Sequence, residues 1–245
     1  MMRQLALIAV AVCISSDAAG AIVPIPVFTG QFSEGFEGFA NGNVAGSAKN
    51  QSGPTAILAG HGTLSGLNPT FTNLAPLYVW NSKGGFNLGL NGVAIPFDGQ
   101  KGVALQSVEP SFDAVGRIDF AAPVTDFGGY WVHAKTATLE TPVTVKFYDN
   151  KNATIGSETV VYDTALQGIS QWAGWSSNIP ISAIEFTGFY AAVDGVQINL
   201  VPEPDARLMC LAALCMITVF YSVKRQRGWR KAGSAIPRGL PNPRG

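Results

Sequence analysis

The chain of 245 residues has 16 basic and 16 acidic residues and a formal net charge of zero, but its charges are unevenly spread. Residues 22–200 contain seven Lys and Arg against thirteen Asp and Glu, which argues against the basic surface that nucleic-acid binding needs. The cysteines, Cys13, Cys210 and Cys215, lie outside that acidic segment. It therefore holds no disulfide, thiolate nucleophile or Cys-ligated metal.

The N-terminus has the three parts of a secretory signal. Arg3 gives a positive start, residues 5–14 are apolar but too short to span a bilayer, and Ala19-Gly20-Ala21 offers small residues to a signal peptidase. We expect residues 1–21 to be a signal peptide that uses the Sec translocon and is removed after Ala21, with Ala19 as the alternative. An uncleaved anchor fits less well because polar residues end the apolar run.

Residues 22–199 are enough for one exported domain with its own core. They contain short runs of alternating apolar and polar residues, separated by turn signals, which predicts an all-β, antiparallel, two-sheet sandwich. The predicted strands are 74–80, 86–95, 117–120, 124–127, 130–134, 143–148, 154–161, 171–175, 181–186 and 192–198.

One predicted hairpin is the most regular part of the pattern. Val143, Val145 and Phe147 alternate with polar residues and should share the buried face of a strand. Residues 149–152, Asp-Asn-Lys-Asn, are turn formers, and an alternating run follows them.

Catalytic motifs are missing from the exported domain. It has two histidines, of which His61 lies in a Gly-His-Gly loop and His133 in a predicted strand. Neither has a nucleophile or carboxylate motif beside it, and there is no P-loop or His-Glu-x-x-His sequence. We therefore expect a protein that is not an enzyme.

A sugar-binding surface is the alternative function. Aromatic rings stack on the C–H faces of sugars, and Trp131, Trp172 and Trp175 could form such a strip for exopolysaccharide. Trp172 should be the most exposed because it lies in a Gln-, Gly- and Ser-rich stretch predicted as a turn. The competing interpretation, which we favour, is that these rings belong to the core.

The C-terminal part combines three membrane-directed features. Val201-Pro202-Glu203-Pro204 precedes an apolar run at 208–223, and Lys224, Arg225 and Arg227 follow it. At about 1.5 Å per residue the run is about 24 Å long as a helix, short for a bilayer core of about 30 Å, but flanking basic residues can snorkel. The excess of basic residues after the run places the tail in the cytoplasm. A buried core helix is disfavoured because the run has no polar face.

This order of motif, apolar segment and basic cluster resembles the PEP-CTERM protein-sorting domain of Gram-negative bacteria. The resemblance covers residues 200–227 and implies recognition by an exosortase, a transpeptidase-like membrane enzyme, in hosts that typically make exopolysaccharide. Family members usually end soon after the basic cluster. This chain continues through residues 228–245, whose composition is typical of a disordered basic tail.

Residues 110–200 also resemble the jelly-roll-like domains of exported PEP-CTERM proteins. Jelly-roll carbohydrate-binding modules often hold a structural calcium between an early acidic residue and one near the last strand. Glu34, Glu37 and Asp194 occupy similar positions here, and solvated surface acids are the alternative. No other cofactor is expected.

Together these features predict a membrane-tethered surface or matrix protein. It is expected to be exported by the Sec route and anchored in the inner membrane with its domain in the periplasm. From there it would pass to the cell surface or the extracellular matrix.

Overall fold

The computed structural model describes residues 22–44, 50–68, 75–81, 99, 101–106, 114–132, 142–161, 169–188, 191–202, 216 and 218. The chain divides into two compact units, Met1–Val201 and Pro202–Gly245. The first unit holds the β domain.

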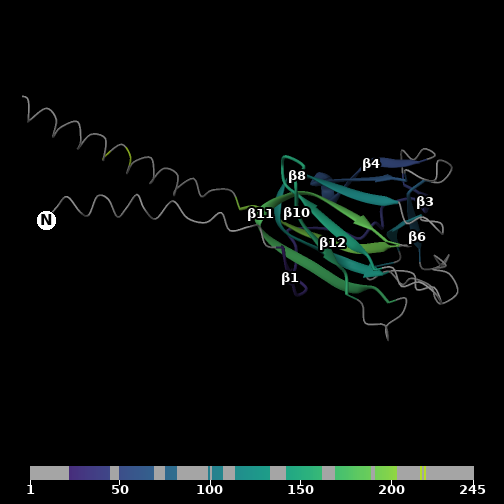
Figure 1. Cartoon of the computed structure of the whole chain (residues 1–245). Helices are drawn as coiled ribbons and strands as arrows, with labels where there is room; N and C mark the ends of the chain where they lie inside the picture. Colours follow the sequence, from purple (N-terminus) through teal and green to yellow (C-terminus); the bar gives the residue numbers. More distant parts are fainter. Residues whose placement is uncertain are drawn as a thin grey trace, which may run out of the picture. The chain divides into compact units, whose positions relative to one another are not determined.

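The described residues of the domain form β strands and one short 3-10 helix (Figure 1). They are β1 (Ile22–Ile25), β2 (Phe32–Glu34), β3 (Gly42–Asn43), β4 (Gln51–Ile57), η1 (Leu58–Gly60), β5 (Gly62–Leu67), β6 (Leu77–Asn81), β7 (Lys101–Leu105), β8 (Val115–Val132), β9 (Thr144–Tyr148), β10 (Thr154–Thr159), β11 (Gln171–Thr187) and β12 (Ala192–Leu200).

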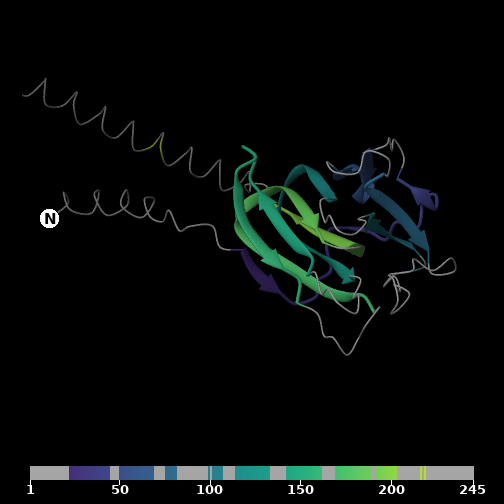
Figure 2. The same cartoon turned by 45° about the vertical axis from the view of Figure 1, so that its right-hand side comes forward.

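The strand pairs between these elements are antiparallel, which confirms the predicted all-β antiparallel class. The main path runs β10-β9-β11-β8-β12-β7-β6-β3. The β4–β5 hairpin joins β8, β2 joins β12, and β1 lies along the first half of β11 (Figure 2).

The two longest strands create a sandwich-like arrangement. In one half of the domain, residues 115–120 of β8 pair with β5 and with residues 183–187 of β11, which also pair with β9. In the other half, residues 124–132 of β8 pair with β12 and with residues 171–176 of β11. We call these halves the β9 layer and the β12 layer.

Aromatic side chains from the two layers meet in the core. Trp131 of the β12 layer packs edge-on against Phe186 of the β9 layer, with ring centroids 5.6 Å apart. Trp175 packs against Phe147 in the same way at 5.4 Å. The inner faces of the two layers therefore bury each other, as in a sandwich.

The layers are not the two separate sheets that we expected, because hydrogen bonds connect all twelve strands into one sheet. The predicted breaks around 121–123 and 176–180 are corners inside β8 and β11. Ser176 pairs with Asp126 and Ile181 with Val124, so between these two pairs β11 has more unpaired residues than β8. Pro123 and Pro180 lie at these corners, where the missing N–H of proline disrupts no regular pairing.

The predicted hairpin between β9 and β10 is confirmed. Val143, Val145 and Phe147 are fully buried. In the turn, Asp149 N–H donates to the Ala153 carbonyl and Asn152 N–H to the Asp149 carbonyl, each at 3.0 Å. Asn152 has a φ of 60°, a left-handed conformation that asparagine tolerates well.

The proposed terminal segments lie largely outside the described residues. This applies to the signal peptide (1–21), to Glu203 and Pro204 of the motif, to Lys224, Arg225 and Arg227, to the tail 228–245 and to nearly all of 208–223. Within the part of the chain that the structure describes, no helix has the length and apolar character needed to cross a membrane.

Candidate functional site

The segment 26–31 crosses the outer face of the β12 layer. It connects β1, which pairs with β11, to β2, which pairs with β12. β8 lies between β11 and β12. Gly30 N–H donates to Gln197 Oε1 at 2.9 Å and Gln31 N–H donates to Asn199 Oδ1 at 3.0 Å. We call this segment the N-terminal strap.

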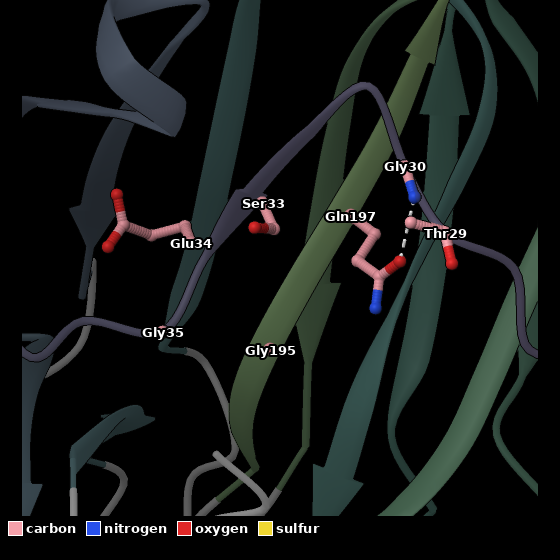
Figure 3. Close-up of a pocket in the computed structure, with 7 residues that line it drawn as sticks. All are labelled: Thr29, Gly30, Ser33, Glu34, Gly35, Gly195 and Gln197. Atoms are coloured by element: carbon pink, nitrogen blue, oxygen red, sulfur yellow. Dashed lines mark hydrogen bonds between the residues drawn. The ribbon is translucent and has the colours of Figure 1, made fainter. Parts of the chain in front are cut away.

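A small pocket of about 160 Å³ lies between the strap, β2 and β12 (Figure 3). Its lining is mostly uncharged: Thr29, Gly30, Ser33, Glu34, Gly35, Gly195 and Gln197. The side-chain amide oxygen of Gln197 accepts a hydrogen bond from the strap, and the Glu34 carboxylate points away from Gln197. The pocket can offer hydroxyl and amide groups to a small neutral molecule, but it does not bring a pair of acid–base groups together.

A β-bulge in β12 shapes this pocket. Asp194 pairs with Tyr130 and Gln197 with Gly128, so β12 has one extra residue in this interval. Gly195, at the bulge, has a φ of 55°, which a residue with a side chain rarely adopts. The extra residue keeps Val193 and Val196 both in the core while Gln197 faces the strap.

Glu34 has a structural role in the adjoining loops. Its two carboxylate oxygens accept hydrogen bonds from Phe36 N–H at 2.9 Å and Leu58 N–H at 3.0 Å. Phe36 and Leu58 are fully buried and have positive φ angles of 58° and 55°. Such conformations are costly for bulky residues, so the charge-assisted bonds from Glu34 stabilise them.

The calcium hypothesis is not supported by the positions of its three carboxylates. Glu34 binds the two loop amides, Glu37 Oε1 accepts from Lys101 N–H at 2.8 Å, and the buried Asp194 accepts from Gly195 N–H. Among the described residues, no group of three or more His, Cys, Asp or Glu is placed to hold a metal ion. Each of the three acids accepts hydrogen bonds from different backbone amides.

The strip of three tryptophans considered as an alternative sugar-stacking surface is not formed. Trp131 is 0% exposed and Trp175 is 3% exposed, because both face the opposite layer. The rings of Phe127 and Trp175 stack with an interplanar angle of 6° inside the core. The competing interpretation, that these rings belong to the core, is the one confirmed for Trp131 and Trp175.

Trp172 is half-buried on the outer face of the β12 layer, in β11 and not in a turn as predicted. Its indole lies over two glycines: a Cβ atom would come within 2.5 Å of the ring at Gly128 and 2.7 Å at Gly174. The strap supplies Phe28 against one edge, and the indole N–H donates to the Ile25 carbonyl at 3.2 Å. Trp172 therefore fastens the strap to the sheet.

Tyr130 completes this aromatic group, with its ring centroid 5.2 Å from that of Trp172. Burial raises the pKa of Tyr130 because the phenolate would be poorly solvated there.

Of the two histidines, the structure describes His61, which packs against an aromatic side chain. His61 stacks on Phe32 with ring centroids 3.6 Å apart, at an interplanar angle of 25°. Its backbone carbonyl accepts from Ala121 N–H at the corner of β8. His133 lies outside the described residues.

The end of β12 is held by a set of side-chain hydrogen bonds that the sequence did not predict. Leu200 N–H donates to Gln31 Oε1 at 2.8 Å, and Asn199 Nδ2 donates to Asp126 Oδ2 at 2.9 Å. Val201 N–H donates to the Pro123 carbonyl at 3.0 Å. We call these residues (Gln31, Pro123, Asp126, Asn199, Leu200 and Val201) the C-terminal clasp.

Comparisons with known proteins show only distant similarity. No protein-family model and no curated protein matches the chain. Among solved structures, the enzymatically active domain of bacteriophage CBA120 tailspike protein 4 aligns with a TM-score of 0.32 and 14% identity, over 58% of this chain and 19% of that one. The CBM22-1–GH10 modules of Clostridium thermocellum xylanase 10B, complexed with xylohexaose, align with a TM-score of 0.33 and 10% identity, over 57% and 26%. The chain thus spans a minor part of each, and the likeness extends no further than a mostly β fold.

Proposed function

We propose that the chain is an exported, membrane-tethered surface or matrix protein and not an enzyme. A sorting enzyme of the exosortase type would recognise Val201-Pro202-Glu203-Pro204 while residues 208–223 and the basic cluster at Lys224, Arg225 and Arg227 hold the chain in the inner membrane. Sec, signal peptidase and the inner membrane are its processing partners. A jelly-roll-like strand connection in the domain is part of the same proposal.

The observation that carries the proposal is the coincidence of two boundaries. The compact β unit ends at Val201, which is also the first residue of the motif inferred from the sequence alone. A sorting signal must follow a finished domain if the domain is to fold before the signal is processed. The position of the boundary supports this order of events.

The C-terminal clasp supports a definite position for cleavage. Leu200 and Val201 have their N–H groups engaged within the domain, while Pro202 is exposed. Processing enzymes act on accessible, unpaired backbone, and a bonded strand end is a poor substrate. We therefore expect the sorting enzyme to cut on the C-terminal side of Val201 and leave the clasp intact.

The test is to express the full chain in a host with an exosortase and in the same host with the enzyme deleted. Intact mass should show a shortened, released protein only when the enzyme is present. Replacing Pro202, Glu203 and Pro204 by Ala should give the membrane-bound form in both hosts. The matched control replaces the tail prolines Pro237, Pro241 and Pro243 and should be processed normally. Equal masses of the unaltered chain in the two hosts would refute sorting and leave a simple anchor.

A further inference from the structure

The outer face of the β9 layer carries a row of polar side chains across four strands, and three of these side chains are charged. The registers place Ser65 of β5 opposite Arg117 of β8, Arg117 opposite Glu185 of β11, and Glu185 opposite Lys146 of β9. This row lies on the face opposite the core. None of the functions considered above uses these residues. Basic and acidic side chains alternate along the row. Solubility requires exposed charges but not this alternation.

Arg117 is held by its neighbours in one position. Its Nε donates to Asp119 Oδ1, its Nη1 to Glu185 Oε1 and its Nη2 to Asn152 Oδ1, each at 2.9 Å. The guanidinium carbon lies 5.1 Å from the centre of the Tyr148 ring, within the range of a cation–π contact. Burial alone would lower the pKa of Arg117, but Glu185 and Asp119 outweigh it and raise that pKa.

Glu185 is oriented from two sides. Arg117 donates to its Oε1 and the Tyr148 hydroxyl donates to its Oε2. Each carboxylate oxygen can accept a second hydrogen bond, and Nη1 of Arg117 carries a second N–H. The pair therefore retains hydrogen-bonding capacity in a preorganised geometry, with side chains 25% and 26% exposed.

A pocket of about 390 Å³ opens beside this pair. Arg117 and Glu185 form its charged end, and Pro54, Leu67 and Val115 supply apolar walls from β4, β5 and β8. Gln51 and Ser65 add polar side chains to the lining. Leu67 is 45% exposed, so an apolar surface is available at the pocket mouth.

We propose that this pocket binds one unit of a neutral saccharide. The C–H face of a sugar ring fits the Pro54, Leu67 and Val115 surface, and vicinal hydroxyls suit the remaining hydrogen-bonding positions of Glu185 and Arg117. The two acids, Asp119 and Glu185, are balanced by Arg117 and Lys146, so the site favours neither anions nor cations. Partly exposed ion pairs add little stability, so stability alone does not explain this network. Positioning a ligand would give it a role.

The test uses the full chain in mild detergent and affinity electrophoresis in gels containing dextran, xylan or mixed-linkage β-glucan, with alginate as the acidic comparison. At least one neutral polysaccharide should retard the protein, and alginate should retard it less. We expect Glu185→Gln to weaken binding about tenfold and Leu67→Ala about threefold, the losses typical of one charge-assisted hydrogen bond and a small apolar contact. The control Glu158→Gln removes a carboxylate from β10, outside the pocket, and should bind normally.

A second pocket variant guards against loss of folding. Ser65→Trp fills the pocket while leaving the Arg117 network in place, and circular dichroism checks that each variant is folded. Binding in folded Ser65→Trp that equals the unaltered chain would overturn the proposal, as would the absence of retardation by all three neutral polysaccharides. Loss of binding on Trp172→Ala with Ser65→Trp unaffected would place the sugar site on the β12 layer and equally refute this assignment.

Discussion

The outer faces of the two layers differ in character although β8 and β11 contribute to both. On the β9 layer these strands present Arg117 and Glu185 beside an open pocket. On the β12 layer they present Tyr130 and Trp172 over a path of glycines, covered by the strap. Because each strand changes layer at a proline corner, the position of a residue relative to that corner decides its environment. Residue type alone does not decide it.

The largest effect should come from removing a core ring, and removing a surface ring should have a smaller one. Trp131→Ala removes a fully buried indole that touches Phe127 and Phe186, and should lower the free energy of unfolding by about 3–5 kcal/mol. Trp172→Ala removes a half-buried indole and should cost about 1–2 kcal/mol. Urea unfolding followed by circular dichroism measures both. Equal losses would mean that the two faces are not distinguished in this way.

Alanine substitutions at two glycines test the same difference between the core face and the outer face by adding a single methyl group. A Cβ at Gly116 would lie 2.1 Å from the core ring of Phe186, whereas one at Gly128 would lie 2.5 Å from the half-exposed Trp172. We expect Gly116→Ala to lower the free energy of unfolding by about 2–3 kcal/mol and Gly128→Ala by about half as much, because Trp172 can move outward. Gly38→Ala, which meets nothing within 4 Å, is the control and should be near neutral. A larger loss at Gly128 than at Gly116 would reverse the assignment of inner and outer faces.

The clasp should make a smaller contribution. Gln31→Ala removes the acceptor for Leu200 N–H near the surface and should cost about 0.5–1.5 kcal/mol. Hydrogen exchange should become faster at Leu200 and stay unchanged at Val145 in the core of the β9 layer. Unaltered exchange at Leu200 would show that Gln31 does not hold the end of β12.

The smallest effect is a difference in tyrosine titration between the layers. Burial raises the pKa of both Tyr130 and Tyr148, and at Tyr148 the Glu185 carboxylate raises it further. A raised tyrosine pKa contributes stability below the unfolded-state value of about 10, and this contribution is lost as the pH rises through the folded-state value. Tyrosinate absorbance should show that Glu185→Gln shifts one titration downward, and the assignment to Tyr148 follows if the shift disappears in Tyr148→Phe. A shift that persists in Tyr148→Phe would place the coupled tyrosine elsewhere.

The strands from residue 115 onward and one hairpin could be predicted from the sequence because they depend on local alternation, whereas β1–β5 and β7 were not predicted and the predicted strand 86–95 lies outside the described residues. Val143, Val145 and Phe147 follow the period of two that one buried face requires, and residues 149–152 have the side chains of a turn. The corners could not be predicted, because Pro123 and Pro180 are equally typical of strand ends and of bends within a strand.

The site residues were harder to predict than the strands. The polar neighbours of Trp172 marked it as the most exposed of the three tryptophans, but its place in a strand, next to the core residue Trp131 on the paired strand, follows only from the pairing of β8 with β11. The Arg117–Glu185 pair joins residues 68 positions apart, and nothing in the local pattern connects them. Such cross-strand contacts depend on register, which the sequence does not specify by itself.

The central claim is that the folded domain ends at Val201 and that the chain is processed beyond it. The most direct measurement is the C-terminal residue of the protein released from exosortase-containing cells, determined from intact mass and C-terminal peptide sequencing. We expect a terminus on the C-terminal side of Val201, with Gln31, Asn199, Leu200 and Val201 retained in the product. A released product that ends at or before Leu200 would contradict it, because the clasp would then have been cut away.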